Sequence, residues 1–351
     1  MKRIGETKNI YIWGVSAYGN LLGQLFDRNG IFWSGYFDNF SVVSGNKLNS
    51  KCIFKKDQID VSPKAVYVLS MRSYQEVKKQ LILAGIDKKQ IVFFDNIDFF
   101  DSIGNAAGYS VSEKLIKSLH NIHKGEKCFV IGNGPSLKVE DLNKIKKAEI
   151  TSFASNMIFK CYDQTHWRPN YYFCADGNEI RKTFKDSSIL NYVSQNSKYV
   201  FIRNSGDLRN CAIENIPNLV FYRSAFSENE QKFEFSQDCS EKIYSGYSVT
   251  YTILQMAVYM GFSEIYLLGI DHNYSMEKQE DGNVIKNKGV KDHSEILGNY
   301  GINGVVDIYK PTCAFRSAQE HAELHNIKIY NATRGGRLEI FERVQFDSLF
   351  G

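Results

Sequence analysis

The chain has 351 residues, about twice the usual length of one domain, so two domains are the first expectation. Hydrophobic residues make up 43% of the sequence, charged residues 23% and aromatic residues 14%, with only 5 prolines, which excludes a disordered, collagen-like or low-complexity protein. The 43 Lys and Arg against 39 Asp and Glu give a formal charge of +4 without long blocks, which argues against a nucleic-acid partner.

The seven cysteines lie far apart, with no pair at C-x-x-C spacing. We interpret them as reduced thiols of a cytoplasmic protein rather than as a disulfide or zinc framework. The N-terminus lacks the apolar stretch of a signal peptide, and no window approaches about 18 consecutive apolar residues, so neither secretion nor a membrane span is expected. Contact with the inner face of a membrane stays open, because short basic or aromatic patches are sufficient for it.

The first hundred residues alternate between strand and helix patterns. Strand patterns occur at residues 9–13, 31–37, 65–70 and 91–94, and helical patterns occur at residues 20–29 and 74–84. Such alternation predicts a parallel sheet that is covered by helices on both faces. We therefore expect a small Rossmann-like domain over residues 1–105.

The turn after the first strand of this domain, Gly14-x-Ser16-x-x-Gly19, approximates a dinucleotide-binding fingerprint, with Asp38 at the end of the second strand. Ser16 replaces the middle glycine, and its side chain would hinder the close approach of a pyrophosphate. A structural or partner-docking role is therefore favoured for this domain over dinucleotide binding.

The alternating pattern restarts after a helical linker at residues 106–126. Strand patterns follow at residues 127–131, 150–154, 171–175, 199–202, 219–222, 264–268 and 327–330. The helix predicted at residues 249–260 is apolar almost all round, which implies burial. We expect a second, larger α/β domain over residues 127–351 that carries the active site. The polar stretch 275–304 breaks the pattern and is predicted to be a long loop or lid.

Polar residues follow four strands of the second domain, at the carboxyl ends where open parallel sheets bind ligands. The first of these strands ends in a Gly-Asn-Gly-Pro-Ser turn, whose glycines would let the backbone approach a ligand. The candidate binding residues at the four ends are Gly132, Asn133, Gly134, Pro135, Ser136, Asn156, Asp176 and Asp271. For each one alone, a turn or a helix cap is as good an interpretation or better, but four such ends converge on one crevice.

Among the seven histidines, His321 and His325 lie four residues apart on a predicted helix, but Ala322 stands where a zinc protease needs Glu. A solvated helix face is therefore favoured over a metal site there. His272 follows a strand end, and His293 lies in the polar stretch, where an imidazole could take a proton from a substrate hydroxyl. A surface histidine in a loop remains an equal alternative.

Several segments of the second domain resemble known enzymes. They are Phe129-Val-Ile-Gly-Asn-Gly-Pro-Ser-Leu137, Ser248-Val-Thr-Tyr, Gly261-Phe-Ser-Glu-Ile-Tyr-Leu-Leu-Gly-Ile-Asp271 and Asn331-Ala-Thr-Arg-Gly-Gly-Arg-Leu338. The first three look like the bacterial sialyltransferases of glycosyltransferase family 42. They look equally like the wider family of motility accessory factor glycosyltransferases and archaeal 6-hydroxymethylpterin diphosphokinases, and the last segment is similar to the close of that family's domain. The resemblance spans residues 127–345.

The resemblance to the sialyltransferases implies transfer of an acidic nine-carbon sugar from its CMP ester, with inversion and without a bound metal. The donor would contact the Gly-Asn-Gly-Pro-Ser turn and Asn156, with Ser248 and Thr250 close by. Tyr274 would stabilise the departing phosphate, which hydroxyl donors can do in place of a metal. The sialyltransferases place their base His shortly before the penultimate helix, and Tyr309 lies near that position here, so His293, earlier in the polar stretch, is the first candidate for the base and His272 the second.

The sequence thus predicts two Rossmann-like domains and a cytoplasmic glycosyltransferase that builds a surface polysaccharide or lipopolysaccharide. Its expected partners are a CMP-linked donor and a glycan or lipid-linked acceptor, with no cofactor and no nucleic acid; a homo-oligomer stays open. One alternative is a Mg-dependent pterin pyrophosphokinase, in which Asp176 and Asp271 are the metal carboxylates, because Asp176 stands where the sialyltransferases carry Asn. The other is a non-catalytic nucleotide-binding subunit of a glycan assembly complex.

Overall fold

The computed structural model describes residues 9–15, 17–28, 30–39, 47–48, 50–69, 74–93, 106–177, 180, 184, 187–203, 216–229, 231–298 and 304–350. The chain divides into two compact units, Met1–Phe99 and Phe100–Gly351. Each unit contains its own sheet with helices around it, and both sheets are mainly parallel, which confirms the predicted fold class.

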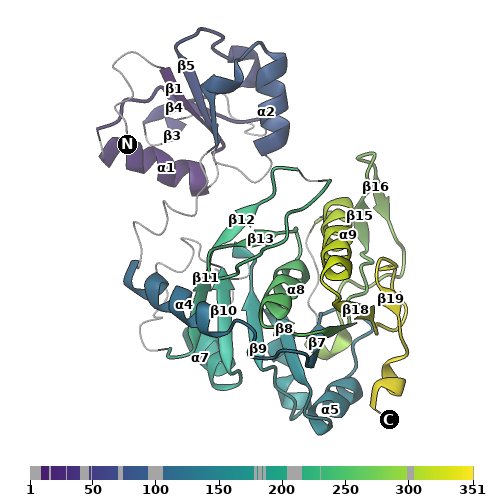
Figure 1. The fold of residues 1–351 in the computed structure, drawn as a ribbon. Coiled ribbons are helices and arrows are strands. Elements are labelled where there is room, and N and C mark those ends of the chain that lie inside the picture. The colour runs from purple at the N-terminus through teal and green to yellow at the C-terminus, as the bar shows by residue number, and fades with distance from the viewer. Residues whose placement is uncertain are drawn as a thin grey trace. The chain divides into compact units, whose positions relative to one another are not determined.

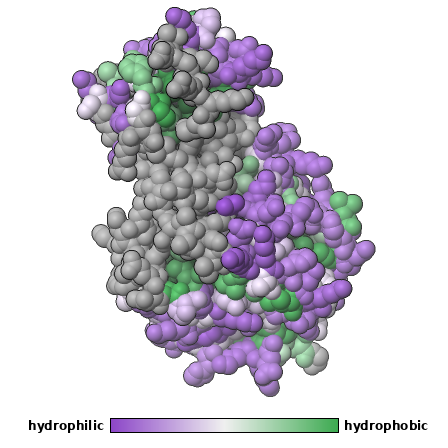
Figure 2. Space-filling model, turned by 60° about the vertical axis from the view of Figure 1, so that its left-hand side comes forward, coloured by the Kyte–Doolittle hydropathy of each residue, from purple (hydrophilic) through white to green (hydrophobic). Residues whose placement is uncertain are grey.

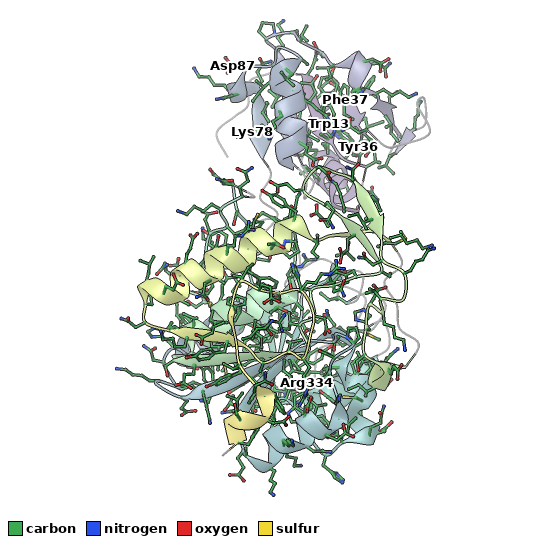
Figure 3. All side chains as sticks on the ribbon, turned by 90° about the vertical axis from the view of Figure 1, so that its right-hand side faces the viewer. Trp13, Tyr36, Phe37, Lys78, Asp87 and Arg334 are labelled. Carbon is green, nitrogen blue, oxygen red and sulfur yellow. The ribbon has the colours of Figure 1, made fainter. Side chains whose placement is uncertain are left out.

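The described residues of the first unit form a six-stranded sheet, parallel except for its first strand. In sheet order the strands are β3 (Lys47–Leu48), β4 (Lys51–Phe54), β2 (Gly35–Phe37), β1 (Asn9–Trp13), β5 (Ala65–Leu69) and β6 (Ile91–Phe93). The helices of this unit, in chain order, are α1 (Ala17–Arg28), η1 (Lys56–Gln58), α2 (Tyr74–Leu83) and η2 (Lys88–Gln90). Because strand side chains alternate between faces, β1 supplies two cores. Trp13 stacks on Phe37 at 5.1 Å on one face (Figure 3), and Ile12 lies with Trp33 on the other.

The fingerprint turn of the first unit is tied to its own sheet. The Gly14 N–H donates to the Phe37 carbonyl at 2.8 Å, and the Val15 N–H donates to the Asp38 carboxylate at 3.2 Å. Ser16 lies outside the described residues. Asp38, the residue that a dinucleotide ribose would need, is therefore engaged in holding the turn to the end of β2, which fits the structural interpretation of this domain.

The described residues of the second unit form an eight-stranded sheet in which all neighbouring strands are parallel. In sheet order these are β11 (Leu219–Tyr222), β10 (Tyr199–Arg203), β9 (Tyr171–Cys174), β8 (Thr151–Ser155), β7 (Lys127–Ile131), β14 (Glu264–Leu268), β18 (Lys328–Asn331) and β19 (Glu342–Arg343). The chain runs outward from β7 to β11 and then returns to β14 on the other side of β7 (Figure 1). The strand order therefore reverses between β7 and β14, and ligands of open parallel sheets bind at the carboxyl ends of such a pair.

Helices cover both faces of this sheet. They are α4 (Ala106–Ser118), α5 (Val139–Lys147), η3 (Asn156–Gln164), α7 (Ser187–Gln195), α8 (Val249–Tyr259), η5 (Glu295–Leu297), α9 (Tyr309–Leu324) and η6 (Phe346–Phe350). As the sequence predicts, α8 is almost wholly buried, with nine of its 11 residues inside the core. Figure 1 shows α8 and α9 side by side over the sheet. Each leads into a parallel strand, so each begins at the carboxyl edge.

The helix that the sequence placed in a linker packs on the second unit. This helix, α4, lies against β11, where the Ser112 hydroxyl accepts a hydrogen bond from the Phe221 N–H at 3.0 Å. At the other end of the chain, Arg334, labelled in Figure 3, pairs with buried Asp141 of α5 and with Asp347 of η6. The first contact attaches α4 to the edge strand of the sheet, and the second joins η6 to α5.

The polar stretch 275–304 is not the irregular loop that the sequence predicted. β15 (Met276–Lys278) pairs antiparallel with β16 (Val284–Lys286), and β17 (Val306–Asp307) pairs parallel with β15. A further pair, β12 (Ser224–Phe226) and β13 (Ile243–Ser245), is also parallel. The β15–β16 hairpin escaped prediction because all three residues of β16 are exposed, so no alternation of polar and apolar residues marks the strand.

Exposed hydrophobic side chains are scattered over the described surface. Phe32, Leu83 and Leu324 are the most exposed of them. On the described part of the face that Figure 2 shows, hydrophobic residues form small patches among hydrophilic ones. Within the described chain, no helix has both the length and the hydropathy of a membrane span. The six described cysteines are free thiols, and Cys211 lies outside the described residues.

Candidate active site

The turn after β7 and the loop after β14 lie against each other at the point where the strand order reverses. The Gly134 N–H donates to the Gly269 carbonyl at 2.8 Å, and the Ser136 hydroxyl donates to the Asp271 carboxylate at 2.9 Å. The Ser136 N–H also points at that carboxylate, at 3.4 Å. A serine–aspartate pair therefore joins two of the strand ends that the sequence singled out.

This close approach explains the glycines of the turn. A Cβ at Gly134 would overlap the Asp271 carboxylate, and one at Gly132 would lie 2.8 Å from Ile270 Cγ1. Gly336, after β18, is constrained in the same way, since a Cβ there would lie 2.5 Å from the Asp271 carbonyl oxygen. From the sequence, we expected the glycines to let the backbone approach a ligand. In the structure, their missing side chains let the turn pack closely against the loop after β14. Ligand contact at these glycines stays a prediction.

We expect Gly134→Ala to lower the free energy of unfolding by about 2 to 4 kcal/mol, because the added methyl group meets a carboxylate held by Ser136 and the Gly269 carbonyl. Gly282→Ala is the matched control. Gly282 has open space around it and, unlike Gly134, a positive φ, of 85°, so its substitution should cost only the backbone strain, about 1 to 2 kcal/mol. Urea unfolding of both variants measures the difference, and equal losses would contradict the packing argument.

Two asparagines at neighbouring strand ends contain buried amide oxygens that no donor of the described residues satisfies. Asn133 donates through Nδ2 to the Ser155 carbonyl at 3.0 Å, but its Oδ1 has no partner in the described chain. Asn156 adopts a left-handed φ of 53°, and its Oδ1 also lacks a partner there. The Tyr172 hydroxyl donates to the Asn156 carbonyl at 2.6 Å and so holds this geometry. Buried acceptors without donors are rare in native proteins, so these two favour a ligand that donates hydrogen bonds.

Asp176 follows β9 and is exposed. It shares the carboxyl edge with the other candidates, but β8 and β7 lie between β9 and β14. With roughly 4.8 Å between neighbouring strands, the ends of β9 and β14 are about 14 Å apart. Metal–oxygen bonds are about 2 to 2.6 Å long, so this separation of the strand ends argues against one ion shared by Asp176 and Asp271. No group of three or more His, Cys, Asp or Glu is placed to hold a metal among the described residues.

The segment that contains His293 is held on the turn after β7. The Ser294 N–H donates to the Asn133 carbonyl at 2.9 Å, and the Ser294 hydroxyl donates to the Leu137 carbonyl at 2.8 Å. Ser294 is itself buried. His293 therefore lies beside the turn at the switch between β7 and β14, although the sequence placed it in a long loop; its role as a base stays a prediction.

His272 is buried, and its hydrogen bond indicates which ring nitrogen carries the proton. The Thr312 hydroxyl donates to the Ile308 carbonyl at 2.7 Å, so it accepts from Nε2–H of His272 at 2.7 Å, which leaves Nδ1 as the acceptor. Burial lowers the pKa of His272 to about 4. A base this weak is poorly matched to proton removal near neutral pH, which favours His293 over His272.

Tyr274 and the start of α8 provide hydrogen-bond donors. Burial, together with the charges of Asp271, Asp292 and Glu277, raises the pKa of Tyr274 to about 12, so its phenol keeps its proton. Ser248 caps α8 and accepts the Thr250 N–H at 3.3 Å. The helix begins at the carboxyl edge of the sheet, so its N-terminal dipole favours an anion at this edge.

A family model described as 6-hydroxymethylpterin diphosphokinase MptE-like matches residues 100–277, just over half of the chain. The match includes every strand from β7 to β14 and the turns that follow them. The chain belongs to the MptE-like family. This membership confirms the resemblance found in the sequence motifs. No curated protein matches this MptE-like chain.

Solved structures similar to this MptE-like chain include the MAf glycosyltransferase from Magnetospirillum magneticum AMB-1, with 13% identity, a TM-score of 0.41, and coverage of 97% of this chain and 58% of that chain. They also include the sialyltransferase CstII from Campylobacter jejuni in complex with a substrate analogue, CMP-3FNeuAc, with 13% identity, a TM-score of 0.35, and coverage of 62% and 86%. A CST-II complex with a trisaccharide acceptor and CMP has 14% identity, a TM-score of 0.33, and coverage of 62% and 86%. The chain thus spans less than two thirds of the length of the first of these.

The candidate site of this MptE-like protein is bordered by a further strand end, that of β18, which the sequence interpretation did not include. After β18, the Thr333 hydroxyl accepts the Ile270 N–H at 3.1 Å, and the Arg337 N–H donates to the Asp271 carbonyl at 2.7 Å. The Arg343 guanidinium holds the same loop through the Gly335 carbonyl at 2.8 Å. This strand end could have been predicted from the sequence, because the Asn-Ala-Thr-Arg-Gly-Gly-Arg motif directly follows a predicted strand, as the other candidate turns do.

Acid should destabilise the MptE-like unit through His272. Because its pKa falls from 6.5 to about 4 on folding, the unfolded chain takes up a proton below pH 6.5 that the folded chain takes up only near pH 4. Stability is complete above pH 6.5 and declines as the pH falls toward 4, by about 2 kcal/mol between pH 7 and pH 5. Urea unfolding at both pH values should show a decline that is smaller by this amount in His272→Gln; an equal decline in both proteins would contradict the assignment.

Proposed function

We propose that this MptE-like protein is a glycosyltransferase. It transfers a sialic or other nonulosonic acid from a CMP donor to a surface glycan or lipid-linked acceptor, with inversion and without a bound metal. One observation carries the proposal: the Ser136–Asp271 pair, at the switch between β7 and β14, shares the carboxyl edge of the sheet with the buried amide oxygens of Asn133 and Asn156, which have no partner among the described residues. The motifs that resemble the sialyltransferases supply these same strand ends.

The nucleotide part of the donor fits the unsatisfied groups. Hydroxyl and amino groups of a nucleoside are donors, and the amide oxygens of Asn133 and Asn156 are acceptors that gain a bond only when such a group binds. The donor phosphate is an anion, which suits the N-terminal end of α8 near Ser248 and Thr250. The base, the ribose and the phosphate would then lie along the ends of β8 and β7 and beside α8.

In the reaction, the bond between the sugar anomeric carbon and the phosphate oxygen breaks while the acceptor oxygen bonds to that carbon from the opposite face. The sugar acquires oxocarbenium character in the transition state. His293 takes the proton from the acceptor hydroxyl, and the Tyr274 phenol, whose pKa of about 12 keeps it protonated, donates a hydrogen bond to the departing CMP phosphate. Preorganised donors at the leaving group serve the purpose that a metal ion serves in other transferases.

The second candidate is a Mg-dependent pterin pyrophosphokinase, which the family description favours. It needs carboxylates that share an ion, and the separation of β9 from β14 argues against Asp176 and Asp271 as that pair. We therefore expect EDTA to leave the rate of sugar transfer unchanged, because the proposed mechanism uses no metal. Initial rates of CMP release with EDTA and with added Mg²⁺ test this. A rate of CMP release that EDTA abolishes and Mg²⁺ restores would contradict the metal-free mechanism, whereas AMP formed from ATP and Mg²⁺, with no CMP release, would favour the kinase.

Thermal-shift titration with CMP, CDP, UDP, GDP and ATP, with and without Mg²⁺, tests the nucleotide class. A ligand that binds only the folded chain raises its melting temperature in proportion to RT ln(1 + [L]/Kd), so the tightest nucleotide gives the largest shift. We expect CMP to give the largest shift, independent of Mg²⁺, and Asn133→Ala to reduce that shift. A response to ATP and Mg²⁺ alone would contradict the proposal.

A further inference from the structure

The side chain of Arg203, at the carboxyl end of β10, is buried, and the described residues offer it no counter-charge. Arg203 is 7% exposed, and its Nε and Nη2 atoms have no hydrogen-bond partner in the part of the chain that the structure describes. Removing a guanidinium from water without an acceptor is strongly unfavourable. Most buried polar groups in native proteins are paired, so this one requires an explanation.

A second buried donor lies next to it. In the parallel pair β10–β11, Arg203 is opposite Tyr222, so both side chains leave the sheet on the same face. Tyr222 is 1% exposed, and among the described residues its hydroxyl lies near the Thr252 side chain but makes no hydrogen bond of good geometry. It packs in the same core as α8, which identifies the face of the sheet. Burial raises the pKa of Tyr222 against the opposing effect of the Arg203 charge, so the phenol stays a donor.

These two side chains lie on the same edge of the sheet as the proposed nucleotide site. The adjacent strands β10, β9, β8, β7 and β14 are all parallel, so the end of β10 shares the carboxyl edge with Asn156 after β8 and Ser136 after β7. With roughly 4.8 Å between strands, Arg203 lies about 10 Å from the end of β8 and about 14 Å from the end of β7. A ligand that extends outward from the nucleotide along this edge reaches Arg203.

We propose that Arg203 and Tyr222 bind an oxyanion, a carboxylate or a phosphate, of a substrate that lies along the edge from β7 to β10. The guanidinium offers parallel N–H donors that match the two oxygens of such a group, and the phenol adds a third donor. The identity of the substrate rests on the function proposed above: the acidic sugar of the donor carries a carboxylate, and a lipid-linked acceptor carries a phosphate. Recognition of the anion itself rests only on the two buried donors.

The stability of the ligand-free protein provides the first test. Arg203→Met removes an unpaired buried charge at similar volume, so the melting temperature should stay unchanged or rise. The matched control is Arg168→Met, because the Arg168 guanidinium is fully paired, for example with Asn196 Oδ1 at 2.7 Å and the Thr165 carbonyl at 2.7 Å. Its loss should lower the melting temperature. An equal decrease for Arg203→Met would mean that its guanidinium is already paired, which would overturn the proposal.

Binding provides the second test, with inorganic phosphate and N-acetylneuraminate as probes of the two anions. Either probe should raise the melting temperature of the wild-type chain, and Arg203→Met should weaken the apparent affinity about 10- to 100-fold, with a smaller loss for Tyr222→Phe. In turnover assays of Arg203→Met, a raised KM for the CMP donor would mean that Arg203 binds an anion of the donor. A raised KM for the acceptor would mean that it binds an anion of the acceptor. Unchanged anion responses and unchanged KM values in Arg203→Met would overturn the proposal.

The two failures are distinguishable. If the wild-type chain binds an anion through Arg203 but transfers no sugar, the anion site stands and the transferase assignment is wrong. If sugar transfer proceeds with the same KM values in Arg203→Met and in the wild type, the assignment stands and the anion site is wrong. Arg203→Lys separates charge from geometry, since it keeps the charge but loses the bidentate pair and should recover only part of the affinity.

Discussion

His293→Ala should lower kcat for sugar transfer by about 10²- to 10⁴-fold, the usual range for loss of a positioned general base, and should leave the Kd for CMP unchanged. We expect this loss because of where His293 lies. Ser294, the next residue, is hydrogen-bonded to the Asn133 and Leu137 carbonyls, so His293 lies at the switch between β7 and β14. The competing histidine, His272, has a pKa of about 4 and donates to Thr312. Initial rates of CMP release and calorimetric titration with CMP measure the two quantities.

His272→Gln is the matched control for this experiment. It removes the other candidate imidazole and keeps a side-chain N–H that can reach Thr312, so kcat should fall by less than about 10-fold. If His272→Gln lost more activity than His293→Ala, the base would be His272, and the pH–rate profile would then follow its pKa of about 4. A wild-type rate in His293→Ala would remove that residue from the mechanism.

Tyr274→Phe should lower kcat by about 10²- to 10³-fold, as loss of one preorganised donor at a developing negative charge does in other enzymes. The phenol keeps its proton because burial and the charges of Asp271, Asp292 and Glu277 raise its pKa to about 12. Phe fills the same volume, so only the donor is lost. KM for the donor sugar should change little, because the charge on the leaving phosphate grows only in the transition state.

Tyr192→Phe serves as the control, since Tyr192 lies exposed on α7 and should tolerate the change without effect on kcat. The contradictory result for Tyr274→Phe is a raised KM with an unchanged kcat. That pattern would mean that the phenol binds the donor equally in the ground state and in the transition state, and that another group stabilises the departing CMP.

The strands of the second unit could be predicted where an apolar run ends in a polar turn. β7 and β14 begin and end where the sequence places them, because both are buried on both faces and are bounded by glycine turns. β16 could not be predicted, since all its residues are exposed and its pairing with β15 depends on the hairpin rather than on hydrophobic period.

The candidate site could be predicted as a set of residues but not as a set of contacts. Ser136 and Asp271 follow predicted strands, yet their hydrogen bond joins positions 135 residues apart and depends on the order of strands in the sheet. The close packing of Gly132 and Gly134 could not be predicted either, because the segment they pack against is the loop after β14, which is distant in the sequence. The burial of Arg203 could not be predicted from the sequence, since a charged residue that ends an apolar strand usually extends to solvent.

If the edge between β7 and β14 binds a CMP-activated sugar, the purified chain should release CMP by sugar transfer. Product analysis with a CMP-linked nonulosonic acid, a lipid-linked or glycan acceptor and EDTA measures this. We expect CMP and a sugar-extended acceptor with inverted anomeric configuration, and loss of both products in His293→Ala. AMP formed from ATP, Mg²⁺ and a pterin, with no CMP released from the sugar donor, would contradict this expectation.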